Sequence, residues 1–281
     1  MMNYVEKPAN PKFGFSHYEK YEDTLDFLAW LKTPKNPTFG GNSSNRGGDT
    51  KWFGGTANMT EALKLAEFGW PEAPKLDAKG AGGIGLLDSF SAEGAIEMDY
   101  SVSGGVVDVG LYLSGIPECM MEFQETPARH ARRIGLELYA NAGVGSDAME
   151  RRGAVITALC EAITRSNDSI EVVLILRWNT NSGSHCCAEV TVKRATEIMS
   201  PQHLAFWCCN TAVFRRFGFS WLEHLPTRFN HGSEGHYGYQ NCNSLPKAYS
   251  DQFDLIMQGH PSSMREAERQ FHEALAAINA R

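Results

Sequence analysis

The sequence predicts a protein of the α/β or α+β class, in which helices flank a mixed sheet. Three observations support this prediction. Residues 170–176 form a nearly continuous apolar run, as expected of a central strand that is covered on both faces. Capping signals at Asp147 and Ser263 each precede apolar residues with helical spacing. Strand-like and helix-like segments also alternate along the second half of the chain, which is the order that builds a layered sheet.

Residues 1–125 predict an N-terminal α+β region. A helix is expected near Tyr18–Leu31, because apolar residues recur there at intervals of three and four. The arm at residues 32–51 contains two prolines, four glycines and three asparagines, so we expect it to lack regular structure and to be mobile. A second helix is expected between its cap Asn58 and Gly69. Three short strands are then expected at Ile96–Val102, Val106–Leu113 and Cys119–Phe123.

Residues 126–281 predict an α/β domain that packs with the N-terminal region as one unit. The order strand, helix, strand, strand, helix, strand, helix implies three layers. The expected elements are a strand at Arg133–Ala140, a helix capped by Asp147 and Glu150, strands at Ile170–Leu176 and Cys187–Arg194, a helix from Pro201 to Gly218, a strand at Phe253–Met257 and a helix capped by Ser263 and Glu266.

Composition excludes several classes of protein. The 281 residues are 42% hydrophobic and 21% charged, which is typical of a globular protein. No apolar stretch approaches the roughly 18 residues that a membrane span needs, and the first residues lack the apolar run of a signal peptide. Seven cysteines form no disulfide framework. We therefore expect a reducing, cytoplasmic location and no membrane partner.

Charge is distributed unevenly along the chain. The net charge is −7, which by itself argues against a nucleic-acid partner. Residues 61–125 carry 3 basic and 12 acidic side chains, whereas residues 126–228 carry 12 basic and 9 acidic ones. The acidic segment 61–125 thus accounts for the net negative charge. The rest of the chain retains basic clusters that can bind a polyanion.

The turn after the first strand of the α/β half reads Asn141-Ala-Gly-Val-Gly-Ser146. Together with the capped helix and the Arg-Gly-Ala that follow, it resembles a von Willebrand factor A-like domain. That family binds a divalent ion through an Asp-x-Ser-x-Ser pattern, but Asn141, Gly143 and Gly145 occupy the matching positions here. The resemblance therefore implies a degenerate domain without its metal. The same glycines do not complete a phosphate-binding motif, and a tight turn is the simpler interpretation.

Cysteine and histidine residues suggest two further kinds of site. Zinc would need ligands two to four residues apart, whereas Cys186-Cys187 and Cys208-Cys209 are adjacent and sit in apolar segments. The segment His231–Tyr239 holds two histidines, a serine and a glutamate, but a loop fixes no geometry for hydrolysis and no Gly-x-Ser-x-Gly elbow is present. We predict no metal, no cofactor and no catalytic set.

Cationic and aromatic residues recur as neighbours, as in proteins that bind single-stranded DNA. Cations follow the phosphates of such a strand, and aromatic rings stack on its bases. Ordinary solvated charges and buried aromatics are the alternative for each cluster. The candidate nucleic-acid-binding residues are Arg46, Lys51, Trp52, Arg132, Arg133, Arg177, Trp178, Lys193, Arg194, Arg228, Tyr237 and Tyr239.

Four segments resemble a family of uncharacterised phage and plasmid proteins. The shared pattern is Trp-x-Gly, then Glu-Ala-Leu-x-Leu-Ala and Gly-Trp within residues 52–72, and the resemblance continues at residues 107–120, 151–159 and 214–219. Within this family, the chain is similar to early proteins of podoviruses that package their own RNA polymerase. The resemblance implies a single-stranded-DNA-binding cofactor that brings a phage RNA polymerase to its promoters in the host cytoplasm.

Two hypotheses from different classes therefore remain. The first is a non-catalytic transcription cofactor that binds single-stranded DNA without base preference and recruits a phage RNA polymerase. The second is a protein-interaction module, namely a metal-less A-type domain that works in phage or host assemblies. A hydrolase that acts through residues 231–239 is a distant third. The sequence does not specify an oligomeric state.

Overall fold

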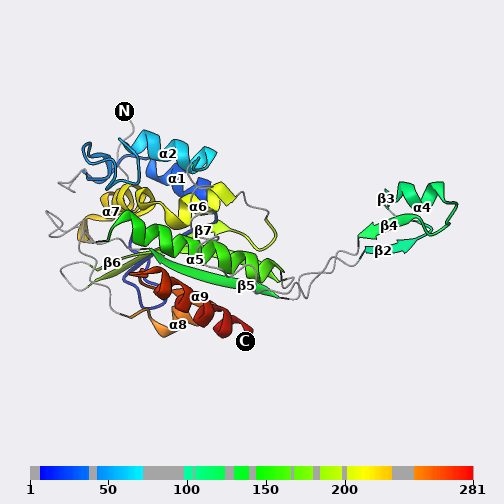
Figure 1. Cartoon of the computed structure of the whole chain (residues 1–281). Helices are drawn as coiled ribbons and strands as arrows, with labels where there is room; N and C mark the ends of the chain where they lie inside the picture. Colours follow the sequence, from blue (N-terminus) through cyan, green and yellow to red (C-terminus); the bar gives the residue numbers. More distant parts are fainter. Residues whose placement is uncertain are drawn as a thin grey trace.

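A five-stranded mixed sheet carries most of the structure (Figure 1). This computed structural model describes residues 7–37, 43–71, 98–103, 105–123, 130–138, 144–165, 168–179, 184–197, 201–229 and 244–280. The strand order is β1-β7-β6-β5-β8. Strands β5, β6 and β8 are parallel, β7 is antiparallel to β6, and β1 is parallel to β7. The bounds are β1 His17–Tyr21, β5 Ala131–Leu138, β6 Ser169–Asn179, β7 His185–Lys193 and β8 Leu255–Met257.

The predicted fold class, an α/β protein with a mixed sheet and flanking helices, is confirmed. The second half of the chain follows the expected order, in which helix α5 joins β5 to β6, α6 follows β7, and α9 follows β8. These helices span Ser146–Arg165, Pro201–Cys209 and Met264–Asn279. The apolar run at residues 170–176 lies inside β6, and all of its residues except Glu171 are buried between the layers on the two faces of the sheet.

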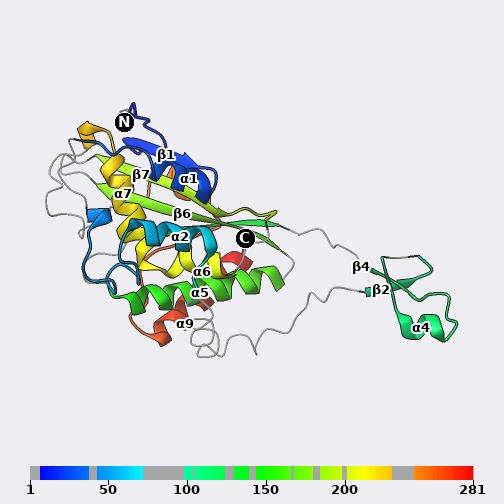
Figure 2. The same cartoon turned by 90° about the horizontal axis from the view of Figure 1, so that it is seen from above.

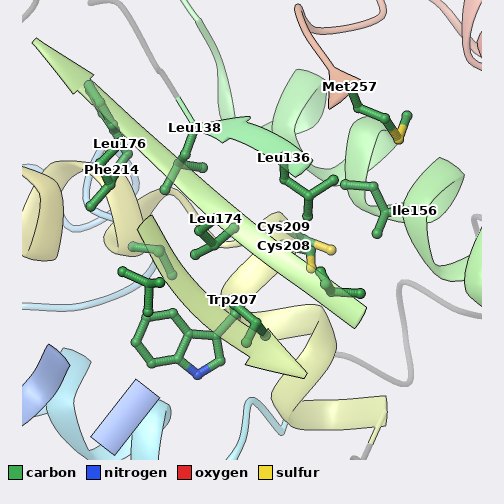
Figure 3. Packing of buried hydrophobic residues seen from close by; sticks show 14 of the residues in the cluster. Leu136, Leu138, Ile156, Leu174, Leu176, Trp207, Cys208, Cys209, Phe214 and Met257 are labelled. Carbon is green, nitrogen blue, oxygen red and sulfur yellow. The ribbon is translucent and has the colours of Figure 1, made fainter. Parts of the chain in front are cut away.

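The long helices cover one face of the sheet. Figure 2 shows α5, α6 and α9 on the same side as α2 (Met59–Phe68). Successive strand residues point to opposite faces, so Leu136 and Leu174 both point toward the helices, where they belong to one hydrophobic cluster with Trp207 of α6 (Figure 3). Helices α1 (Thr24–Leu31) and α7 (Phe219–His224) contribute to the same hydrophobic core.

The other face of the sheet has a thinner cover. Val173, Ile175 and Cys187 point to this side and form a separate small cluster with Phe15 and Tyr249. Phe15 precedes β1, and Tyr249 belongs to the short helix α8 (Lys247–Ser250). The sheet therefore lies between a thick helical layer and a thin layer of loop and helical turn.

The predicted helix caps Asn58 and Ser263 are confirmed, whereas the predicted cap Asp147 is wrong, because α5 begins at Ser146 and Asp147 lies inside its first turn. The Asn58 side chain accepts a hydrogen bond from Glu61 N at 3.0 Å, and the Glu61 carboxylate accepts one from Ala57 N at 2.5 Å. The Ser263 hydroxyl accepts a bond from Glu266 N at 3.3 Å in the same way. Each cap satisfies backbone donors that the first turn of a helix leaves without a partner.

The helix predicted near Tyr18–Leu31 is wrong in its first part. Residues 17–21 form β1, and α1 begins only after Asp23, whose carboxylate accepts a hydrogen bond from Asp26 N at 2.8 Å. The periodicity misled because the strand mixes polar and aromatic residues, and all of them except Lys20 are buried. Hydropathy alone did not distinguish the two elements.

Two other predicted elements are each divided in the structure. Asp108 accepts hydrogen bonds from Gly110 N and Leu111 N, so the strand β3 (Val106–Val107) gives way to the helix α4 (Val109–Leu113). The helix predicted from Pro201 to Gly218 pauses at Asn210, whose side chain accepts a bond from Ala212 N at 2.8 Å. A π-helical turn, η2 (Val213–Gly218), then leads into α7.

Residues 98–123 form a small unit of their own (Figure 1). Strands β2 (Met98–Ser101), β4 (Met120–Phe123) and β3 make an antiparallel sheet in the order β2-β4-β3. In contrast, β1, α1 and α2 share the hydrophobic core of the larger sheet. Within the described ranges, no helix combines the length and apolar character that crossing a membrane requires.

Candidate functional site

The parallel strands define two edges of the large sheet. At the carboxyl edge, β5 ends at Leu138, β6 at Asn179 and β8 at Met257, while β7 begins at His185. At the amino edge, β5 and β6 begin and β7 ends. Ligands of α/β sheets bind beside the carboxyl ends of strands, where the strand order changes direction. Here that point is next to β5, because β6 lies on one side of it and β8 on the other.

The structure does not bring the twelve candidate nucleic-acid-binding residues together. Lys193 contacts Ile170 O near the start of β6, whereas Arg177 lies near its end, seven positions and roughly 23 Å further along the strand. Tyr237 and Tyr239 lie outside the described residues. The carboxyl edge has Arg46, Lys51, Trp52, Arg177, Trp178 and Arg228, and the amino edge has Arg132, Arg133, Lys193 and Arg194.

Arg216 fastens the loop of residues 43–56 to the carboxyl edge. It belongs to η2, whose Phe214 lies beside Leu176 near the end of β6 (Figure 3). The Arg216 side chain is fully buried. It donates to Ser44 O at 3.0 Å, Arg46 O at 2.9 Å, Thr56 O at 2.8 Å and Thr56 Oγ1 at 3.2 Å. A buried guanidinium that donates to three loop carbonyls and a loop hydroxyl fixes the path of the loop.

Arg215 makes a second attachment, through Trp52. It donates to Trp52 O at 2.7 Å and to Val144 O at 2.6 Å, and its Cζ lies 4.2 Å from the centre of the Trp52 ring. Burial lowers the pKa of Arg215 to about 10, so the side chain stays charged at neutral pH. The Trp52 ring also packs on Phe219, at 6.0 Å between centroids. Trp52 therefore anchors the loop, in contrast to the free stacking ring that the sequence predicts.

The described parts of the arm at residues 32–51 are docked rather than free. Asn36 is buried and donates to Leu225 O at 2.8 Å. Glu223 of α7 is fully buried, and its carboxylate accepts from Ser44 Oγ at 2.6 Å and from Ser44 N at 3.0 Å. Lys35 Nζ lies 2.5 Å from the same carboxylate. The buried carboxylate of Glu223 thus ties the described parts of the arm to α7, and such partners are distant in the sequence, so composition alone did not indicate them.

Arg177 and Trp178 are not surface residues, contrary to the prediction. The Arg177 side chain is 4% exposed and pairs with the buried carboxylate of Glu137 at 2.5 Å. Trp178 is 8% exposed and belongs to the hydrophobic core. Both residues lie within β6, between β5 and β7, so their role is in the sheet. A phosphate cannot reach Arg177 without separating a buried ion pair.

The candidate residues of the amino edge are engaged in ion pairs and hydrogen bonds with neighbouring strands and loops. Arg132 Nε lies 3.0 Å from the Asp168 carboxylate, and Arg133 pairs with the carboxylates of Glu189 and Glu171. The other two contacts are Lys193 Nζ to Ile170 O at 3.0 Å and Arg194 to Asp23 at 3.1 Å. Three of these four cations are therefore paired with carboxylates and Lys193 binds backbone carbonyls, which favours a structural role for them.

Three of the candidate residues, Arg46, Lys51 and Arg228, are exposed at the carboxyl edge. Arg46 and Lys51 lie on the docked loop. Arg228 belongs to the 3₁₀ turn η3 (Thr227–Phe229), and the Phe229 ring lies 5.3 Å from the His17 ring at the start of β1. The structure thus places three exposed cations on segments that rigid contacts hold beside the carboxyl ends of the strands.

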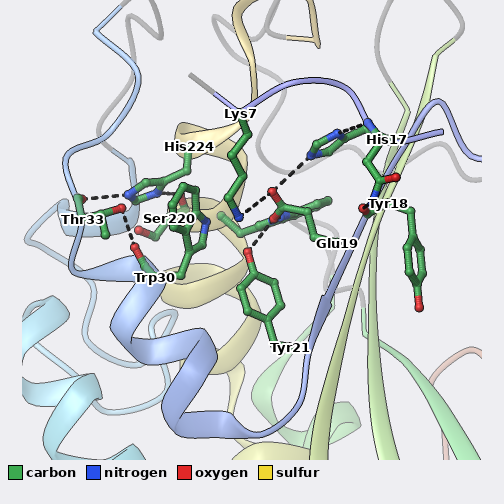
Figure 4. A network of polar contacts seen from close by, with 11 residues as sticks. Lys7, His17, Tyr18, Glu19, Tyr21, Trp30, Thr33, Ser220 and His224 are labelled. Carbon is green, nitrogen blue, oxygen red and sulfur yellow. Dashed lines mark hydrogen bonds and ion pairs between the residues drawn. The ribbon is translucent and has the colours of Figure 1, made fainter. Parts of the chain in front are cut away.

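A buried carboxylate, Glu19, organises a network that sequence reasoning missed (Figure 4). It accepts hydrogen bonds from Tyr21 Oη at 2.5 Å and Trp221 Nε1 at 2.9 Å, while His17 Nε2 and Lys7 Nζ lie 3.2 and 3.0 Å from it. Burial alone would raise the pKa of Glu19, but the bonds from His17 and Tyr21 and the charge of Lys7 lower it to about 2. The alternation His17-x-Glu19-x-Tyr21 was the only signal in the sequence.

Cysteine and histidine residues do not assemble into a metal site in the described part of the chain, where no group of three or more potential ligands occurs. Cys186 points into the core beneath the helices and Cys187 into the cluster on the opposite face, because successive residues of a strand point to opposite sides of the sheet. Burial raises the pKa of the Cys186 thiol to about 12, so it is a poor nucleophile. The predicted turn residues Asn141 and Gly143 and the segment 231–239 lie outside the described residues.

These features define an α/β protein in which a docked loop presents cations at the carboxyl edge of a mixed sheet. A family model described as "Domain of unknown function (DUF7192)" matches residues 11–278, and the chain belongs to this family. The match extends over both the large sheet and the 98–123 unit. No curated protein and no solved structure matches the chain.

Proposed function

We propose that the protein is a single-stranded-DNA-binding transcription cofactor for a phage RNA polymerase, with no catalytic role of its own. The observation that carries DNA binding is the docked loop, which holds Arg46 and Lys51 in the solvent at the carboxyl edge. Exposed cations on a fixed support bind phosphates at a lower entropic cost than cations on a free arm. The resemblance to phage early proteins is the argument for the transcriptional role.

Of the twelve candidate nucleic-acid-binding residues, three form the proposed interface. Arg46, Lys51 and Arg228 are exposed, whereas the amino-edge cations already have carboxylate or carbonyl partners within the protein. Contacts to phosphates carry no sequence information, so binding is expected to be indifferent to base sequence. Salt weakens such binding because each neutralised phosphate releases condensed counterions.

Fluorescence anisotropy with a labelled oligo-dT strand at two salt concentrations tests this proposal. The Arg46→Ala/Lys51→Ala protein should bind more weakly than the unmodified chain. Its plot of log affinity against log salt should lose about 1.4 of its slope, because about 0.7 counterion is released per contact in single strands. Removing exposed cations elsewhere, as in Lys20→Ala/Arg194→Ala, should leave affinity unchanged at moderate salt.

Two results would contradict the proposal. Equal weakening by both double substitutions would show that binding follows net charge and needs no interface at the carboxyl edge. Equal affinity for duplex and single-stranded oligonucleotides, or affinity that does not respond to salt, would favour the second hypothesis, a protein-interaction module. The 98–123 unit, whose apolar side chains are exposed, supports an additional role in binding a protein.

A further inference from the structure

Exposed apolar side chains are concentrated in the 98–123 unit. Nine large hydrophobic residues are exposed in the described part of the chain, and the main body contributes only Leu25 and Phe68. Soluble monomers rarely expose apolar groups so densely without a binding role. The seven exposed residues of the unit are Tyr100, Val102, Val107, Val109, Tyr112, Leu113 and Ile116.

Four of these side chains lie on or next to α4, and we call them the α4 face. Val109, Tyr112 and Leu113 are three and four positions apart, so they share one side of the helix. They are 62%, 64% and 78% exposed, and Ile116 follows just after the helix. Both views show α4 beside the small sheet and away from the large one (Figures 1 and 2).

The charge around the α4 face is of one sign. Residues 80–128 contain no lysine, arginine or histidine. Within the unit, Asp108 begins α4 and Glu118 follows Ile116 in an exposed position. Carboxylates without cations repel nucleic acid and anionic lipid, and two copies of the unit repel each other. Charge complementarity therefore favours a basic protein surface that also offers apolar side chains.

We propose that the α4 face is the docking surface for a basic protein partner. The choice of that partner rests on the proposed function, in which the polymerase is the protein to be recruited, and nucleic-acid enzymes carry extended basic surfaces. Apolar contacts of Tyr112 and Leu113 supply the affinity, and the carboxylates speed and orient the encounter. DNA and polymerase thus bind different parts of the chain, the carboxyl edge and the 98–123 unit.

Binding of the full chain to immobilised phage RNA polymerase, measured by biolayer interferometry, tests the proposal. Tyr112→Ser/Leu113→Ser should weaken binding at least about tenfold through lost apolar burial. Leu25→Ser/Phe68→Ser removes two equally exposed apolar side chains from the main body and should bind like the unmodified chain. Glu118→Lys, which alters no apolar contact, should also weaken binding and reduce its dependence on salt.

Three results of the polymerase-binding experiment would overturn the inference. They are no binding of the unmodified chain, an equal loss of affinity in both double-serine variants, and unchanged affinity after Glu118→Lys. A change of molar mass in light scattering with Tyr112→Ser/Leu113→Ser would instead assign the face to a second copy. Sedimentation with phosphatidylcholine vesicles that depends on Tyr112 would assign it to a membrane. The DNA anisotropy measurement is independent of polymerase binding, so its failure counts against the proposed DNA binding and not against the α4 face as a docking surface.

Discussion

At the scale of single residues, Glu19 shows how a buried charge holds distant segments together. Its carboxylate joins Lys7 near the start of the described chain, His17 and Tyr21 of β1, and Trp221 of α7. A buried carboxylate is costly unless donors satisfy it, and these four donors supply that compensation. The network therefore fixes β1 at the edge of the sheet against α7.

Replacing Glu19 by glutamine should destabilise the protein by about 3 kcal/mol at pH 7. The pKa of Glu19 is lowered to about 2 in the folded state from about 4.3 in an unfolded chain. The stabilisation is therefore present above about pH 4.3 and is lost as the pH falls toward 2. Urea unfolding from pH 7 to pH 3 should show the difference between the two proteins shrinking with acid.

The matched control for this prediction is Glu22→Gln, which changes an exposed carboxylate three residues further on. It should alter the free energy of unfolding by only a few tenths of a kcal/mol, as is usual for surface ion pairs. If Glu19→Gln were as stable as this control at pH 7, the network would contribute nothing and β1 would be held by backbone pairing alone.

Residue roles could be predicted from the sequence only where the residue type decides them. Asn58 and Ser263 cap helices because their side chains accept from backbone donors, and that chemistry is local. Arg177 and Arg216 look like surface cations in the sequence, yet both are buried by partners far along the chain. Pairing of this kind depends on tertiary contacts, which no window of sequence contains.

At the scale of elements, side chains of η2 bind the 43–56 loop and hold it against the carboxyl edge of the sheet. A π-helical turn widens the backbone spacing and places Arg215 and Arg216 where both reach the loop. Arg216 Cζ lies 3.7 Å from the centre of the Phe53 ring, so the guanidinium is held by an aromatic face as well as by carbonyls. The exposed cations Arg46 and Lys51 owe their fixed position to these contacts.

Arg216→Lys should release the loop while leaving the sheet folded. Lysine keeps the positive charge but presents a single ammonium group, which cannot reach the three carbonyl oxygens that the guanidinium binds. We expect faster amide hydrogen exchange in residues 43–56 and weaker DNA binding, with unchanged exchange in α5. Mass spectrometry of peptic fragments measures both regions in one experiment. Unchanged exchange in the loop would show that Arg215 and Trp52 hold it without Arg216.

The element order was largely predictable, but the exact boundaries were not. The apolar run of β6 and the spacing in α5 follow from burial, which the sequence records directly. Strand β1 was hidden because its residues Glu19 and His17 are polar and buried. Asp108 and Asn210 end elements by bonding to nearby backbone, and their effect competes with a hydrophobic periodicity that continues past them.

At the scale of the whole molecule, the chain has two parts with different surface chemistry. The large sheet carries both hydrophobic cores, and neither core contains a residue of the 98–123 unit. The unit has a single buried hydrophobic side chain among its described residues, Cys119. The stability of the large sheet should therefore not depend on the unit.

Replacing residues 98–123 by a glycine-serine linker of equal length should change the melting temperature of the main body by only a few degrees. The replacement also removes four carboxylates, those of Asp99, Asp108, Glu118 and Glu122, without removing a cation. DNA affinity should therefore rise at low salt and match the full chain near physiological salt, where the Debye length is about 8 Å. Calorimetry and anisotropy on the same two proteins measure both effects. A large drop in melting temperature would mean that the unit packs on the main body and that its apolar face is already occupied.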